Sequence, residues 1–65
     1  MHIYLNGEER NTDAGSVSEL LAELDVKGRM IAIERNMEVV PKSAYADTAL
    51  VEGDRLEIVH MIGGG

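Results

Sequence analysis

The stretch "VSELLAELD", residues 17–25, has the period of an amphipathic helix. Its apolar residues follow the i, i+3, i+4, i+7 spacing that forms one stripe: Val17, Leu20, Leu21 and Leu24. Ser16 precedes the stretch and Glu19 follows three residues later, which is typical of the capping box at a helix start. We expect a helix that begins near Val17, ends at about residue 25 and is closed by Gly28. This helix must cover the apolar side of whatever the other segments form.

The beginning of the chain predicts a β-hairpin. In "MHIYLN" apolar and other residues alternate, with Ile3 and Leu5 on one side, as a half-buried strand requires. Asn6 and Gly7 both tolerate a positive φ, so "EERNT" should return antiparallel beside the first strand. The polar character of the return strand favours a position at the edge of a sheet.

The second half of the chain predicts further strands. "MIAIER" alternates with Ile31 and Ile33 on one side, and "MEVV" follows it across a turn at Arg35-Asn36. Pro41 cannot donate a ladder hydrogen bond and ends that strand, ahead of a loop in "KSAYADTAL" with one short helical turn. "EGD" is a turn, and "RLEIVHMI" is a last long strand. The element order therefore predicts an α+β fold of two layers.

The composition excludes several classes of site. The chain has no cysteine, which rules out disulfides, thiolate metal sites and a cysteine nucleophile. Its two histidines and scattered carboxylates lack the spacing of metal ligands, and the glycines form no phosphate-binding loop, so we expect no metal site and no catalytic residue. The formal net charge of -6 disfavours binding to nucleic acid or anionic membrane and favours a partner with a basic docking face. Since no secretory or membrane segment stands out, we expect a cytoplasmic protein.

The chain ends in "VHMIGGG", and two interpretations fit this end. It can be a frayed or engineered terminus. Alternatively, the terminal carboxylate of Gly65 is ionised at neutral pH and can attack an activated phosphate. Gly63 and Gly64 lack a Cβ, so the tail could thread through a channel too narrow for other residues.

The whole chain resembles the thiamine-biosynthesis sulfur carrier family (ThiS), whose members are small relatives of ubiquitin with the β-grasp fold. The stretches that carry the resemblance are "IYLNGE", "VSELLAEL", "ERN" followed by "VVPKSAY", and above all "EGDRLEIVHMIGGG". The last stretch is the most specific, because a Gly-Asp turn, an apolar strand and a diglycine end occur together in few families. Members end in Gly-Gly, whereas this chain has a third glycine.

The resemblance implies a β-grasp fold: a mixed sheet of four to five strands, with one main helix packed on one face and the first and last strands adjacent and parallel. We expect a single domain over residues 1–62 and a flexible glycine tail, residues 63–65, that is disordered in the free protein. The expected core is Ile3, Leu5, Val17, Leu20, Leu21, Leu24, Ile31, Ile33, Leu50, Leu56 and Ile58.

The resemblance also implies a carrier that is a protein co-substrate and not an enzyme. An adenylating enzyme (ThiF-like) would use ATP and magnesium to convert the Gly65 carboxylate into an acyl-adenylate. Persulfide sulfur from a cysteine desulfurase or persulfide relay would then displace AMP. The resulting thiocarboxylate on Gly65 would give its sulfur to a thiazole synthase (ThiG-like) that builds the thiazole of thiamine. The chain itself would bind no cofactor and would be a monomer when free.

The last strand is expected to contribute to partner docking. If Leu56 and Ile58 point inward, period-2 alternation turns Val59 and Met61 outward, directly before the tail. We therefore assign partner docking to Val59, Met61 and Ile62.

Three other functions stay open. A carrier for molybdopterin or another metabolite would share the fold, the tail and the activation chemistry, although the compact "VVPKSAY" loop resembles the thiamine group more closely. A ubiquitin-like modifier would join the activated Gly65 to lysines of other proteins. A plain interaction module would have an inert tail, and its function would survive deletion of the tail.

Overall fold

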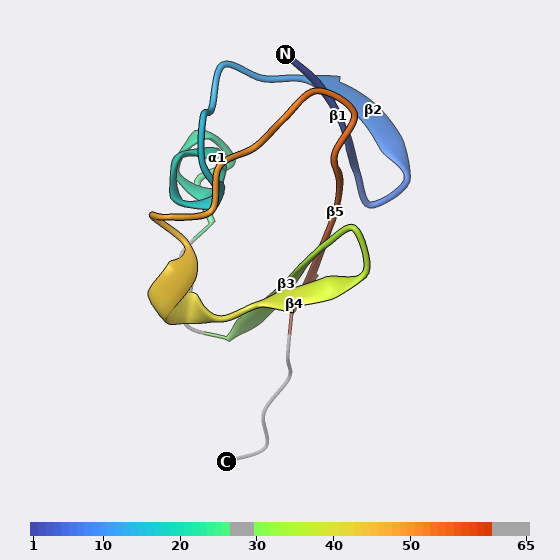
Figure 1. Ribbon diagram of the computed structural model, residues 1–65. Helices are drawn as coiled ribbons and strands as arrows, with labels where there is room; N and C mark the ends of the chain where they lie inside the picture. The colour runs from blue at the N-terminus through green and yellow to red at the C-terminus, as the bar shows by residue number, and fades with distance from the viewer. Residues whose placement is uncertain (27–29, 61–65) are drawn as a thin grey trace.

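The computed structural model describes residues 1–26 and 30–60, which form a five-stranded sheet with one α-helix (Figure 1). The elements are β1 (His2–Leu5), β2 (Glu8–Asn11), α1 (Val17–Glu23), β3 (Ile31–Arg35), β4 (Glu38–Val40), the short 3-10 turn η1 (Lys42–Ala44) and β5 (Arg55–His60). The strand order β2-β1-β5-β3-β4 places β5 at the centre of the sheet. β5 lies parallel to β1 and antiparallel to β3. The predicted mixed sheet, with its first and last strands adjacent and parallel, is confirmed.

The first hairpin forms at the predicted turn. Asn6 and Gly7 have φ values of 50° and 85°, which is the backbone geometry of a two-residue hairpin turn that matches the twist of its strands. β1 and β2 pair antiparallel from Leu5 opposite Glu8 to His2 opposite Asn11. β2 is the outermost strand on this side, so the prediction of a polar edge strand is also confirmed.

The second hairpin turns one residue later than the sequence predicts. Arg35 is the last residue of β3, and the turn residues are Asn36 and Met37, with φ values of 51° and 72°. Arg35 stays in the strand because it pairs with Glu38 of β4 on one side and with Leu56 of β5 on the other. The prediction of a turn at Arg35-Asn36 is therefore wrong by one position.

The helix begins where the capping pattern predicts. Ser16 has an extended backbone, and its Oγ accepts a hydrogen bond from the Glu19 N–H at 3.1 Å. The Glu19 carboxylate reaches back as in a capping box, but it accepts from the N–H of Gly15, at 2.7 Å, one residue before the usual partner. The Ser16 side chain thus satisfies an amide group that the first helical turn leaves without a partner, and the Glu19 side chain satisfies the amide just before the N-cap.

The helix ends earlier than predicted, at Glu23. The N–H of Asp25 donates to the Ala22 carbonyl at 3.1 Å and that of Val26 to the Leu21 carbonyl at 3.0 Å, the two bonds of a Schellman motif. Asp25 occupies the left-handed position of this motif, with φ 57°. The prediction that Gly28 closes the helix is wrong, because Asp25 takes the conformation that usually calls for glycine.

The core lies between α1 and one face of the sheet. In Figure 1, α1 and η1 lie on the same side of the sheet, on the left of the view. Eight of the residues expected in the core are buried: Ile3, Val17, Leu20, Leu21, Ile31, Ile33, Leu50 and Leu56. The other three, Leu5, Leu24 and Ile58, are only partly buried and pack against that cluster. The structure adds Ala14 and Val40 to the core, and Val40 is inward because it pairs with Ile33.

The described helices are short. α1 has seven residues, and neither it nor any other helix in the described ranges has the length and apolar character needed to cross a membrane. The predicted boundary between the domain and the glycine tail lies outside the described residues.

Candidate functional site

The described part of the candidate site is β5, the strand that leads toward the glycine end. β5 ends at His60. The residues assigned to sulfur transfer and tail threading, Gly63, Gly64 and Gly65, lie outside the described residues, and so do Met61 and Ile62 of the expected docking set. Val59 is the one docking residue whose position the structure describes.

Two neighbouring strands hold β5 along different parts of its length. β1 pairs with its beginning, where Tyr4 lies opposite Arg55 and Leu5 opposite Leu56. β3 pairs with it from Leu56 as far as His60, which lies opposite Ile31. Past the end of β1, the second side of β5 is held by a side chain.

That side chain belongs to Asn6. The Asn6 N–H donates to the Leu56 carbonyl at 2.8 Å, which continues the β1 ladder by one bond. The Asn6 Oδ1 then accepts from the Ile58 N–H at 2.9 Å, and its Nδ2 donates to the Ile58 carbonyl at 3.5 Å. The amide group therefore acts as one further residue of β1 and extends the support of β5 toward its end.

Asn36 holds the beginning of β5 in a similar way. Its N–H donates to the Arg55 carbonyl at 2.7 Å, and its Oδ1 accepts from the Arg55 N–H at 3.0 Å. Its Nδ2 donates to Asp54 Oδ1 at 3.0 Å. The first residue of each hairpin turn thus bonds the backbone of the central strand, Asn36 at Arg55 and Asn6 at Leu56 and Ile58.

Asp54 is a buried carboxylate immediately before β5, with a relative exposure of 3 %. Besides the amide of Asn36, its oxygens accept from Arg35 Nε at 2.8 Å and from the Val51 N–H at 2.9 Å. Burial raises the pKa of Asp54, but the hydrogen bonds from Arg35, Val51 and Asn36 outweigh burial and hold the pKa below its ordinary value. Asp54 is therefore ionised at neutral pH. Its carboxylate links β3, through Arg35, and the β3–β4 turn, through Asn36, to the start of β5.

Sequence reasoning missed the roles of Asn6, Asn36 and Asp54. It identified the first two as turn residues and "EGD" as a turn, which says nothing of side-chain partners. The available signal was the repetition of an asparagine at the first position of each hairpin turn. Asparagine is one of the few residues that combine a positive φ with a side chain able to donate and accept.

One face of β5 points away from α1. Val59 is 51 % exposed, whereas Leu56 is buried, so the predicted outward orientation of Val59 is confirmed. On the same face the Arg55 guanidinium lies over the Tyr4 ring, 4.5 Å from its centroid. Glu57 lies opposite Glu34 of β3. The side of the sheet that carries Tyr4, Glu34, Arg55, Glu57 and Val59 is called the open face.

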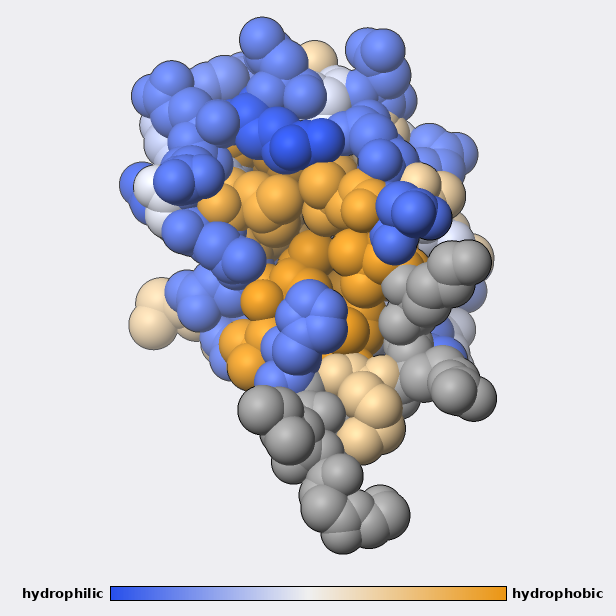
Figure 2. All heavy atoms as spheres, turned by 180° about the vertical axis from the view of Figure 1, so that it is seen from behind, coloured by the Kyte–Doolittle hydropathy of each residue, from blue (hydrophilic) through white to orange (hydrophobic). Residues whose placement is uncertain are grey.

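Apolar side chains packed against the core also reach the surface of the molecule. Partly buried apolar side chains pack around it, among them Leu5, Leu24, Val26 and Ile58. Figure 2, seen from behind, shows apolar atoms at the surface in the middle of the molecule with polar side chains around them. A helix of seven residues is too short to cover a five-stranded sheet completely.

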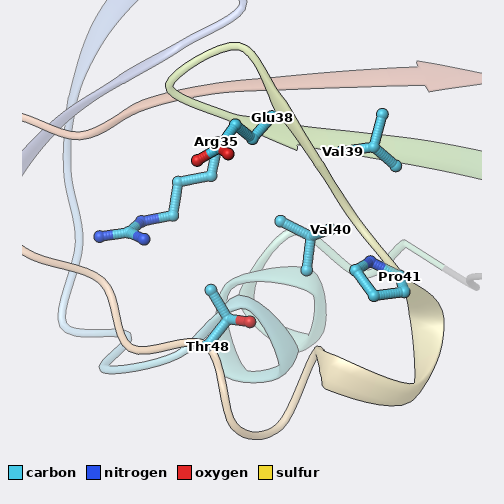
Figure 3. Close-up of a pocket in the computed structure, with 6 residues that line it drawn as sticks. All are labelled: Arg35, Glu38, Val39, Val40, Pro41 and Thr48. Atoms are coloured by element: carbon cyan, nitrogen blue, oxygen red, sulfur yellow. The ribbon is translucent and has the colours of Figure 1, made fainter.

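A shallow pocket of about 220 Å³ lies between the β3–β4 hairpin and the loop after η1 (Figure 3). Its lining comprises Arg35, Glu38, Val39, Val40, Pro41 and Thr48. Arg35 Nε is bound to Asp54, and Thr48 Oγ1 donates to the Ala44 carbonyl at 2.7 Å, so both polar groups serve the fold. The pocket has no paired nucleophile and base.

In residues 1–26 and 30–60 no group of three potential metal ligands comes together.

Comparison with known proteins relates this chain to one family. The model of the ThiS family matches residues 3–65. The sulfur carrier protein ThiS of Bacillus subtilis is 35 % identical over 65 residues, which cover 97 % of this chain and 98 % of that protein. A thiazole synthase of Paramagnetospirillum magneticum is 56 % identical over the whole of this chain, and a second from Magnetococcus marinus is 46 % identical. The chain spans about a fifth of the length of these two synthases.

A solved structure has the same architecture. The crystal structure of the thiamine biosynthesis protein ThiS from Geobacter metallireducens matches with a TM-score of 0.88 at 32 % identity, and the match covers all of both chains. The five-stranded mixed sheet with one helix is therefore the β-grasp fold of that protein. From the match to residues 3–65 and this agreement in fold, we conclude that the chain belongs to the ThiS family.

Proposed function

We propose that this chain is a sulfur carrier of thiamine biosynthesis whose reactive group is the terminal carboxylate of Gly65. The observation that carries the proposal is the extent of the family match, which runs through the final glycines to residue 65. The Bacillus subtilis sulfur carrier aligns over almost its whole length with almost the whole of this chain. The chain is thus a protein co-substrate that partner enzymes act on.

The chemistry requires activation because a carboxylate is a poor electrophile. A carboxylate oxygen of Gly65 attacks the α-phosphorus of ATP, bound with magnesium by an adenylating enzyme, and pyrophosphate leaves. The acyl carbon now has AMP as its leaving group. Persulfide sulfur from a cysteine desulfurase or a persulfide relay displaces AMP, and cleavage of the sulfur–sulfur bond by a thiol leaves a thiocarboxylate. This chain has no cysteine, so none of its own side chains competes for the sulfur.

The proposed acceptor of the sulfur is a thiazole synthase. Two proteins of that name contain a stretch 56 % and 46 % identical to this chain, which supports a partnership between the two activities. Both the adenylating enzyme and the synthase must reach Gly65, so both must approach the end of β5. Val59, together with Met61 and Ile62, is proposed to form part of the surface that they cover.

The proposal is tested by measuring the intact mass of the chain. The protein is incubated with ATP, magnesium, the adenylating enzyme and a persulfide donor. We expect a mass increase that corresponds to the replacement of one oxygen by sulfur, and none when ATP is omitted.

A chain that lacks Gly64 and Gly65 is the matched control. We expect it to fold normally, since every residue of the described core precedes the glycines in the sequence, and to gain no sulfur. Sulfur gained by the truncated chain would show that the reactive group lies elsewhere. Isopeptide-linked conjugates in place of the sulfur product would identify the chain as a protein modifier.

A further inference from the structure

Two glutamates face each other in the middle of the open face. Glu34 of β3 lies directly opposite Glu57 of β5 in the antiparallel pairing of the two strands. Opposed residues of neighbouring strands have Cβ atoms only about 4.5–5.5 Å apart, and like charges placed in this way destabilise a sheet. Glu57 is exposed, and Glu34 is half-buried, which reduces the screening of its charge by water.

No described cation neutralises this pair. Within residues 1–26 and 30–60 ion pairs join Arg10 to Glu23 and Arg35 to Asp54, and the His2 ring contacts the Glu9 carboxylate. Arg55 is on the same face as Glu57, but its guanidinium stacks on Tyr4. Within the described residues, therefore, no ion pair offsets the repulsion between the two carboxylates.

Apolar side chains border the carboxylate pair. Val39 of β4 lies opposite Glu34 on its other side and is 69 % exposed. In the next row, Ala32 lies opposite Val59, which is 51 % exposed. The open-face patch, defined as Ala32, Glu34, Val39, Glu57 and Val59, thus combines an apolar border with two negative charges that no ion pair of the described residues neutralises.

We propose that the open-face patch docks on a surface of thiazole synthase that presents an arginine or lysine between Glu34 and Glu57, with apolar groups around it. The proposal rests on the function proposed above. A guanidinium is planar and has enough donors to bond both carboxylates, and a dry apolar border strengthens such bonds. The synthase is the favoured occupant because a stretch like this chain forms part of two thiazole synthases. The formal net charge of -6 also favours encounter with a basic surface.

The experiment measures equilibrium binding of the unmodified carrier to recombinant thiazole synthase of the same organism by titration calorimetry. The variants are Glu34→Gln and Glu57→Gln, each of which removes one charge and keeps the size of the side chain. Glu8→Gln is the matched control, since Glu8 is an exposed strand glutamate opposite Leu5 and outside the open-face patch. We expect each patch variant to bind at least about fivefold more weakly, and the control to bind like the original chain.

Thermal unfolding of the same variants gives a second readout with the opposite sign. Removing either charge relieves the repulsion, so the unfolding temperature should rise for Glu34→Gln and Glu57→Gln and stay unchanged for Glu8→Gln. If the two glutamates served only the fold, their substitution would not weaken binding to the synthase while raising the unfolding temperature.

Several outcomes would overturn the inference. One is that both patch variants bind the synthase like the original chain, or that Glu8→Gln loses as much binding as they do. Another is that the original chain shows no detectable binding to the synthase. A third is that the patch variants bind only the adenylating enzyme more weakly and bind the synthase normally. The measurement uses the carrier before any sulfur is attached. If the variants bind the synthase as expected but the original chain gains no sulfur, the proposed function alone is refuted. If the original chain gains sulfur but the patch variants bind the synthase normally, the docking site alone is refuted.

Discussion

Asparagine occupies the first position of both hairpin turns, and each side chain stabilises the same strand. Asn6 and Asn36 both have a φ near 50°, a conformation that asparagine tolerates better than most residues. Their amides also bond the backbone of β5 at Ile58 and Arg55. Turn formation and support of the central strand are thus combined in single residues.

Replacement by glycine separates these two roles, because glycine keeps the positive φ and removes the amide. We expect Asn6→Gly to lower the free energy of unfolding by about 1 kcal/mol, since its bonds to Ile58 are exposed. Asn36→Gly should cost about 1.5–3 kcal/mol, because it also removes a donor from the buried Asp54 carboxylate. Urea titration of both variants measures the difference. Equal losses would mean that the bond to Asp54 contributes little.

At the scale of single elements, the end of α1 contains a destabilising residue, whereas the beginning of β5 is held by several hydrogen bonds. α1 ends at Glu23, and Asp25, just past this end, has a positive φ and a negative charge close to the terminus where the helix dipole is also negative. Both features oppose stability. β5 is held at its beginning by the bonds from Asn36 and by the pairing of Leu56 with Arg35, and Val59 on its outward side is exposed.

Substitution of Asp25 should therefore stabilise the protein. Asp25→Asn removes only the charge, and we expect a gain of about 0.3–0.5 kcal/mol. Asp25→Gly also relieves the left-handed backbone, and the gain should reach about 0.5–1 kcal/mol. Thermal unfolding measures both. A loss of stability in Asp25→Gly, with the helix content unchanged, would show that Asp25 makes a favourable contact that offsets its strain.

The outward side of β5 predicts a separate effect on activation of the tail. Val59 and Val51 are exposed to nearly the same extent, 51 % and 52 %, but Val51 lies in the loop before β5. We expect Val59→Ser to lower the rate of adenylation at low carrier concentration by at least about fivefold, and Val51→Ser to leave it unchanged. Pyrophosphate release by the adenylating enzyme provides the measurement. Equal rates for Val59→Ser and the original chain would move the docking surface away from this strand.

The whole molecule is a two-layer domain with one short helix, and it has few ways to compensate for a lost interaction. For a chain of 65 residues the free energy of unfolding is about 3–10 kcal/mol. Asp54 joins the β3–β4 hairpin, the loop at Val51 and the start of β5 through one buried carboxylate. Its protonation therefore affects the stability of the entire fold.

We expect stability to fall at low pH with a contribution from Asp54. Its pKa is held below the ordinary value in the folded state, so the ionised form stabilises the fold at every pH above the pKa of the unfolded chain, about 3.9. The contribution is lost as the pH falls from about 4 through the lower folded pKa. Asp54→Asn should flatten this part of the pH profile and cost about 1.5–3 kcal/mol at pH 7.

Urea titrations from pH 7 to pH 2 measure the profile. Glu23 is a suitable comparison, because the hydrogen bond from Thr12 also holds its pKa below the ordinary value, but its carboxylate is on the surface. Glu23→Gln should change the profile less than Asp54→Asn. An Asp54→Asn variant with the same acid dependence as the original chain would show that other carboxylates cause the loss.

Local patterns in the sequence determined most of the architecture. The i, i+3, i+4, i+7 repeat and the Ser16 cap located the start of α1, and alternation located the strands. Eight of the eleven residues expected in the core are buried. These predictions succeed because backbone propensity, capping and side-chain period depend on neighbours within a few residues. Stretches along the whole chain, above all the last strand with its glycine-rich end, indicated the family, whose model matches residues 3–65.

The tertiary structure decided what depends on residues far apart in the chain. Asn6 and Ile58 are separated by 52 positions, and Asp54 and Arg35 by 19, so no local pattern could pair them. The opposition of Glu34 and Glu57 likewise exists only in the register of β3 against β5. A register shift of one residue would place every side chain of a strand on the other face. The sequence thus determined which elements form, and only their packing determined which charges, amides and apolar groups meet on the strand that leads to Gly65.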